Sequence, residues 1–224
     1  MVVAAVMAML GGCASGNSPE QDTLAALIAG KHHASPPIPA EPDLRYRYLR
    51  VEVQGYPPAL LVLGYIDPHP TGAIEVWYSA QREVIKTQNG RVVATAGLPI
   101  DWTAVRFVST PPSWDQVPQQ SLQFQRSRDE MPGYRYGIVE QVQWVPVSGV
   151  PAIPLVATLP MATANTYQWF QESVKATQGG AALPDAWFAW GKHRGDWAVV
   201  YSHQCLTADF CLRLQRWPVR EGVQ

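Results

Sequence analysis

Most of the chain after residue 44 alternates between apolar and polar positions with a period of two. The pattern runs through "LRYRYLRVEVQ", "AIEVWYSA", "AVRFVST", "SLQFQRS" and "YRYGIVEQVQWVPV". Such alternation, with many β-branched and aromatic side chains, is typical of half-buried strands. Short strands at intervals of roughly 8–12 residues predict a mainly β fold, an antiparallel β-sandwich or a partly open barrel with one or two short helices.

One hairpin is predicted with particular clarity, in "REVIKTQNGRVVATAGLP" at residues 82–99. Two alternating runs flank Asn89-Gly90, a pair that accepts the positive φ angles of a type I′ turn. Gly97 and Pro99 then end the second strand, because proline cannot donate to a sheet ladder.

Three other segments carry distinct patterns. "ALLVLGYI" (residues 59–66) is almost wholly apolar, which predicts a strand buried on both faces. Residues 163–178 place Tyr167, Phe170 and Val174 at helical spacing, which predicts an amphipathic helix. Residues 185–205 and 210–219 read as a hairpin and a third strand, with the turn of the hairpin at residues 194–196.

The first 43 residues differ from the rest. Leu10-Gly11-Gly12-Cys13 follows an apolar run and resembles the bacterial lipobox. The resemblance implies a lipoprotein signal at 1–12 and a diacylated Cys13 as the mature N-terminus; a second or third acyl chain makes such an anchor stable. The alternative is a buried helix start with an ordinary cysteine. Residues 13–43 would hold a capped helix from Ser18 to about Ile28 and a proline-rich linker, before a single β-rich domain at 44–224.

Composition narrows the function classes. The 224 residues are 47% hydrophobic and 16% charged, which suits one globular domain with a real core. The formal net charge is −1 and no run of Lys and Arg stands out, so nucleic acid is not an expected partner.

The remaining cysteines, Cys205 and Cys211, flank a short connection between strand-like runs. In an exported protein these two residues are expected to form a disulfide. Metal binding is the weaker alternative, because no further ligands lie nearby at the usual spacing.

No metal, cofactor or catalytic group is predicted. His32, His33 and His69 fall in linker and turn sequences; His193 and His203 could face each other across the last hairpin, but two histidines are too few for a zinc site. Motifs of hydrolases, nucleotide-binding enzymes and metalloproteases are missing from the sequence. Asp129-Glu130 lies in a polar stretch and reads as a solvated loop.

Trp187 and Trp190 are the candidate glycan contacts. They lie on opposite faces of one predicted strand, so one of them must face the core. A ring left on the outer face could stack on the C–H surface of a sugar. Core packing is the alternative for either ring.

The region "VWYSAQREVIKTQNGRVVATAGLPIDW" resembles the signature of the group 4 capsule polysaccharide lipoprotein family (YjbF/GfcB). The resemblance rests on a strand with Trp and Ser, a hairpin with Gly-Arg at its turn, and a Thr-x-Gly-Leu exit. It implies an outer-membrane lipoprotein, facing the periplasm, that serves exopolysaccharide or capsule export without known catalysis. The residues that match are Trp77, Ser79, Gly90, Arg91, Thr95, Gly97 and Leu98.

Three functions follow as hypotheses. The first is a non-enzymatic accessory for polysaccharide secretion or assembly that docks onto export components such as an outer-membrane barrel. The second is a periplasmic module that binds the glycan itself through exposed aromatic rings. The third is a polysaccharide-modifying enzyme, which would need a cleft with paired carboxylates.

Overall fold

The computed structural model describes residues 38–39, 42–116, 121–178 and 180–219. The chain divides into two compact units, Met1–Ala34 and Ser35–Gln224, and every described residue belongs to the second. Several predictions concern residues outside the described ones. These are Cys13, the helix from Ser18 to about Ile28, most of the linker, His32 and His33.

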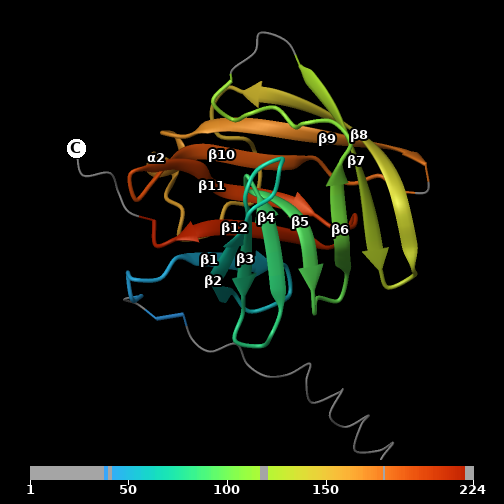
Figure 1. Ribbon diagram of the computed structural model, residues 1–224. Helices are drawn as coiled ribbons and strands as arrows, with labels where there is room; N and C mark the ends of the chain where they lie inside the picture. The colour runs from blue at the N-terminus through green and yellow to red at the C-terminus, as the bar shows by residue number, and fades with distance from the viewer. Residues whose placement is uncertain (1–37, 40–41, 117–120, 179, 220–224) are drawn as a thin grey trace, which may run out of the picture. The chain divides into compact units, whose positions relative to one another are not determined.

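The described part of the second unit is almost entirely sheet (Figure 1). Its strands are β1 (Tyr48–Val53), β2 (Ala59–Asp67), β3 (Ile74–Tyr78), β4 (Val84–Gln88), β5 (Arg91–Ala96), β6 (Asp101–Phe107), β7 (Leu122–Met131), β8 (Arg135–Val147), β9 (Gln168–Gln178), β10 (Ala186–His193), β11 (Asp196–Cys205) and β12 (Cys211–Trp217). One short helix, α2 (Met161–Ala164), precedes β9.

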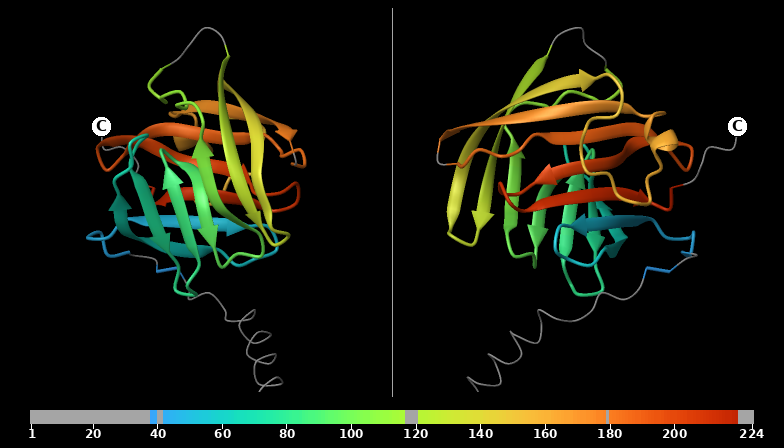
Figure 2. Two further views of the ribbon diagram at one scale, coloured as in Figure 1. Left: turned by 45° about the vertical axis from the view of Figure 1, so that its right-hand side comes forward. Right: turned by 180° about the vertical axis from the view of Figure 1, so that it is seen from behind.

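Strands that follow one another in sequence pair in antiparallel ladders, except β5 and β6, and β1 also pairs with β12. The sheet therefore curls round on itself, with β5 and β6 at its two edges. These edges are joined by side chains: Thr95 Oγ1 donates to Asp101 Oδ1 at 2.8 Å and accepts from the Trp102 backbone N–H at 3.0 Å. The result is a nearly closed barrel (Figures 1 and 2). The predicted mainly β fold is confirmed, in its partly open barrel form.

The helix predicted at 163–178 is wrong, because most of that segment is strand β9. Trp169 faces outward and Phe170 inward, yet both are completely buried. The outer face of β9 to β11 is covered by the connection between β8 and β9, which includes α2 (Figure 2, right). Since both faces of β9 are buried at its start, the period of two is hidden and a helical spacing appears in its place.

The strand at 59–66 corresponds to β2, but its burial on both faces was predicted wrongly. The second half of β2 is exposed, with Tyr65 at 49% and Ile66 at 46%. An antiparallel sheet can leave one face in water, whereas the apolar run favoured the two-sided burial of a parallel strand. The predicted terminal hairpin and third strand are confirmed as β10, β11 and β12, with the turn at Arg194 and Gly195.

Candidate functional site

The candidate site is built around the β4–β5 hairpin. Its tip residues Asn89 and Gly90 have φ angles of 49° and 79°, as the predicted type I′ turn requires. The strands on either side, Val84–Gln88 and Arg91–Ala96, match the prediction as well.

The tip of this hairpin packs across the barrel against β11, which is not a ladder neighbour of β4 or β5 (Figure 1). A β-carbon at Gly90 would lie 2.4 Å from the Val199 side chain, so only glycine fits there. Gln204 clamps the tip: its Nε2 donates to the Gly90 carbonyl at 2.9 Å and its Oε1 accepts from the Val92 N–H at 2.9 Å. The indole of Trp114 donates to the Asn89 carbonyl at 2.8 Å.

Arg91 anchors the hairpin from inside the barrel. Its side chain is 2% exposed, and Nε donates to Glu172 Oε1 at 2.7 Å. The guanidinium carbon lies 3.9 Å from the ring centre of Trp114, a cation–π contact in a buried setting. Burial lowers the pKa of the Arg91 guanidinium, and the Glu172 carboxylate opposes that shift. Arginine remains charged nonetheless, so the pair is a buried ion pair.

The exit of the hairpin is held by an aspartate that sequence reasoning missed. Asp101 accepts the backbone N–H groups of Gly97 and Leu98 at 3.0 and 3.2 Å, in addition to the Thr95 hydroxyl. An acidic residue within a few positions of a turn glycine is a known turn signal, and it could have identified Asp101. The motif residues Thr95, Gly97 and Leu98 thus shape the seam between β5 and β6.

Trp77, another residue of the predicted family motif, also has a structural role. Its ring is buried, and its indole donates to Thr87 Oγ1 at 3.0 Å. The Arg216 guanidinium lies 5.7 Å from the ring centre.

A second buried polar cluster lies on β7 and β8. Arg126 and Arg128 each donate through Nε to one oxygen of Glu140, both at 2.7 Å. Arg128 also pairs with Glu130, which receives Arg135 as well. These carboxylates are engaged by guanidinium groups, which does not suit them to the proton transfer of a paired-carboxylate hydrolase.

The solvated loop predicted at Asp129-Glu130 is wrong, because both residues lie in β7 and are buried. Asp129 accepts from Arg106 and from the Gly137 backbone N–H, both at 2.8 Å. These hydrogen bonds, that of Gly137 foremost, lower the pKa of the Asp129 carboxyl. The polar residues of this stretch form an internal network of ion pairs, which the local sequence pattern does not reveal.

A groove of about 260 Å³ opens beside the hairpin tip. Asn89 and Gly90 line it together with residues from the start of β1, the end of β2, the start of β3, the β10–β11 turn and the end of β12. Trp190 and Trp197 stack in it, with ring centres 6.0 Å apart and planes at 20°. Cationic side chains, Arg47 and Arg194, also line it.

The structure separates the two predicted glycan contacts. Trp190 lines the groove, whereas Trp187 is half-buried and pairs in register with His203, away from it. Trp197 was missed by sequence reasoning, although the residue is 59% exposed and lines the groove. Its place just after the tight turn at Arg194-Gly195 was the available signal.

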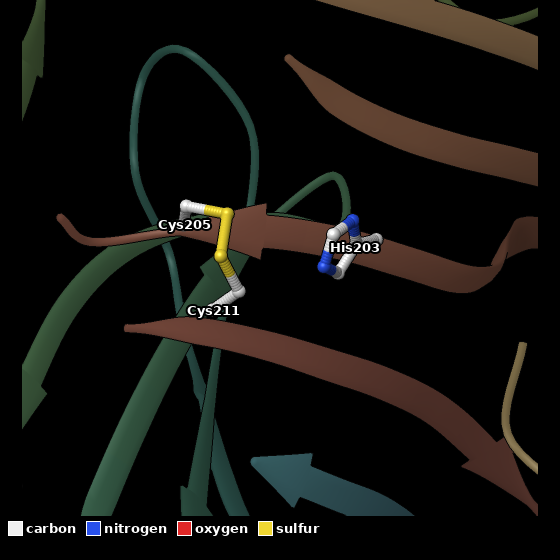
Figure 3. A group of neighbouring side chains, drawn as sticks. All are labelled: His203, Cys205 and Cys211. Carbon is white, nitrogen blue, oxygen red and sulfur yellow. A yellow bond between two sulfur atoms is a disulfide. The ribbon is translucent and has the colours of Figure 1, made fainter. Parts of the chain in front are cut away.

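Cys205 and Cys211 are joined by a disulfide, and His203 lies beside it (Figure 3). The three ligating atoms lie within 4.8 Å of one another. A disulfide sulfur is not the thiolate that binds metals, so this group in its oxidised form does not suit a metal ion. Burial, followed by the charge of Arg213, lowers the pKa of His203. The predicted facing of His193 and His203 is wrong, because His193 pairs with Asp196 and His203 with Trp187.

His69 has a structural setting in the β2–β3 turn. Its Nδ1 lies 2.9 Å from Thr71 Oγ1 and 3.3 Å from Gln88 Nε2, which ties the turn to the end of β4. Among the described residues, no helix has the length and apolar character needed to cross a bilayer.

Comparisons with known proteins give a family match and a similar fold. The family model described as group 4 capsule polysaccharide lipoprotein gfcB, YjbF, matches residues 21–178, which include the whole hairpin motif. The crystal structure of the hypothetical lipoprotein YmcC from Escherichia coli (K12) superposes with a TM-score of 0.60 at 17% identity, covering 93% of this chain and 100% of that one. At that identity the likeness concerns the fold. A comparison with curated proteins gives no match.

Proposed function

The chain belongs to the group 4 capsule polysaccharide lipoprotein family, and from this membership we propose that it is a non-enzymatic accessory in exopolysaccharide or capsule secretion or assembly. It would be held at the outer membrane, facing the periplasm, by a lipid on Cys13. Its partners would be polysaccharide export components, such as an outer-membrane barrel.

The proposal that the protein is not an enzyme rests on the ion pairs of its buried glutamates. Glu130, Glu140 and Glu172 are almost completely buried, and each is bonded to at least one arginine. A general acid or base must instead reach a proton on the substrate. These three acids therefore serve the rigidity of the barrel, and rigidity suits a protein that acts by presenting a surface.

One observation favours direct glycan binding as a second candidate. The groove combines stacked indole rings with polar and cationic side chains, which is the usual composition of a saccharide site. The two candidates are compatible, because an export accessory could hold the polymer that it helps to deliver. A polysaccharide-modifying enzyme has less support, since the acids of the buried clusters are engaged by arginines.

The test is deletion of the gene in its own host. Extracellular polymer should fall while cell-associated polymer is still made, and the residual secreted chains should keep their normal linkages. Complementation by the native chain should restore secretion. If the purified protein instead shortens or remodels the polymer, and one Asp, Glu or His substitution abolishes that while the fold persists, the accessory function is refuted.

A further inference from the structure

The groove has a rigid aromatic platform. Trp197 is 59% exposed, but its ring is backed by Trp190, which is itself partly buried against the aromatic cluster inside the barrel. Lys192 lies 5.8 Å from the Trp197 ring centre on the same side of the hairpin. A large ring held in place at the surface can stack on a flat apolar face with little loss of side-chain entropy.

The charge of the groove is opposite to that of the chain. Glu75 is neutralised by Arg216, whose Nη2 lies 2.7 Å from its carboxylate. The remaining charged side chains of the groove are Asp196, Arg47 and Arg194, so the cations are in excess. Arg194 donates to the Leu44 carbonyl at 3.2 Å, whereas the Arg47 side chain forms no ion pair or hydrogen bond with any described residue. The chain as a whole has a formal charge of −1, so this local cationic excess is not a consequence of composition.

The floor of the groove is fixed by the family motif. Asn89 and Gly90 line it, and their position is set by the close packing of Gly90 on Val199 and by the buried pair of Arg91 with Glu172. The motif therefore shapes a surface although its buried members cannot touch a ligand. A fixed floor lowers the cost of ordering the site when a ligand binds.

We infer that this groove binds a carboxylate-bearing sugar residue of a polysaccharide chain. The C–H face of the sugar would stack on Trp197. Its carboxylate would accept hydrogen bonds from Arg47, because a planar guanidinium can donate two parallel hydrogen bonds to a carboxylate. The cavity of about 260 Å³ is slightly smaller than usual ligand pockets, which are roughly 300–1,000 Å³, so it suits one or two sugar residues of a polymer. This inference rests on the proposed function and names the chemistry of its polymer.

The probes are a tetragalacturonate and the same tetrasaccharide with its carboxyl groups reduced to alcohols. The full chain, purified in detergent, is titrated with each and followed by tryptophan fluorescence and calorimetry. The acidic probe should bind with a Kd in about the millimolar range or tighter, at least about tenfold tighter than the neutral one, and its binding should weaken as salt rises.

Two substitutions test the named residues. Trp197→Ala should weaken binding of the acidic probe about tenfold, and Arg47→Gln should reduce its preference over the neutral probe. Matched controls are Tyr136→Ala, an equally exposed aromatic residue on β8, and Arg45→Gln, an exposed arginine paired with Asp43. Both should bind like the native chain, and thermal unfolding checks that every variant is folded.

The inference is overturned if the acidic probe does not bind, if both probes bind equally, or if the two groove variants bind as the controls do. The proposed function is judged separately. If deletion lowers secretion and the doubly substituted Trp197→Ala, Arg47→Gln chain restores it fully, the accessory role stands and the groove does not serve it.

Discussion

Arg91 Nε and Glu172 Oε1 lie 2.7 Å apart inside the barrel, although 81 residues separate them in the chain. The contact joins the tip of the β4–β5 hairpin to β9, and both side chains are almost completely buried. A hairpin that appears self-contained in the sequence is thereby fixed to the far side of the sheet. This relationship explains why arginine follows the turn glycine, and it leads to the first prediction.

Removing one partner of this pair should be strongly destabilising. Arg91→Met leaves the Glu172 carboxylate buried and uncompensated, and the free energy of unfolding should fall by about 3–5 kcal/mol. The double variant Arg91→Met, Glu172→Leu should recover most of that loss, because no charge remains buried. Urea unfolding measures all three proteins. Equal losses in the single and double variants would contradict this account.

Gly90→Ala should cost about 2 kcal/mol or more of unfolding free energy. The new methyl group would lie 2.4 Å from the Val199 side chain, in a backbone with φ of +79°. Gly149→Ala is the matched control, because its φ of +74° is similar but no atom lies within 4 Å of the added carbon. That control should lose only about 1 kcal/mol, from backbone strain. If both variants lose the same amount, the close packing of the tip is not what requires glycine.

Reduction of Cys205–Cys211 should lower stability moderately. The bond closes a loop with a sequence separation of six, for which loop entropy gives about 2 kcal/mol. When the protein is purified from its own host and denatured without reduction, neither residue should react as a free thiol. The Cys205→Ser, Cys211→Ser variant should lose the same stability as the reduced native chain. Two reactive thiols in unreduced material would refute the pairing in the cell.

His203 should make stability fall as the pH is lowered. Burial and Arg213 lower its pKa in the folded state below that of an ordinary histidine, about 6.5. The unfolded chain then binds the proton more readily, so stability is full above that pH and declines as the pH falls below it. His203→Gln should show a shallower decline between pH 7.5 and 5.5 by urea unfolding. Parallel curves for the two proteins would assign the pH dependence to other groups.

The lipid anchor is a prediction from the sequence alone. Cells that grow on labelled palmitate should incorporate the label into the native chain, and Cys13→Ser should abolish that incorporation and release the protein from the outer-membrane fraction. Cys205→Ser serves as the control, because it removes a cysteine outside the lipobox. A native chain without label that still fractionates with the outer membrane would exclude acylation of Cys13.

The sequence by itself determined most of the strands and the tight turn between β4 and β5. These depend on local physics: alternation places side chains on two faces, and Asn-Gly accepts the positive φ angles that the turn needs. The resemblance to the family also came from one continuous segment of the sequence. The order of the strands and the choice of a barrel required the pairing of β1 with β12, which joins distant parts of the chain.

Tertiary structure decided the rest, because burial depends on partners far away in sequence. The segment at 163–178 became a strand once a covering loop buried its outer face, and Asp129 and Glu130 became internal when arginines from β6, β7 and β8 surrounded them. The groove is likewise made by six separate stretches of the chain, so its tryptophan at position 197 had no local signature beyond a turn. Alternation with a period of two shows which residues share a face of a strand. It does not show what packs against that face, and the ion pairs and the groove of this protein depend on that packing.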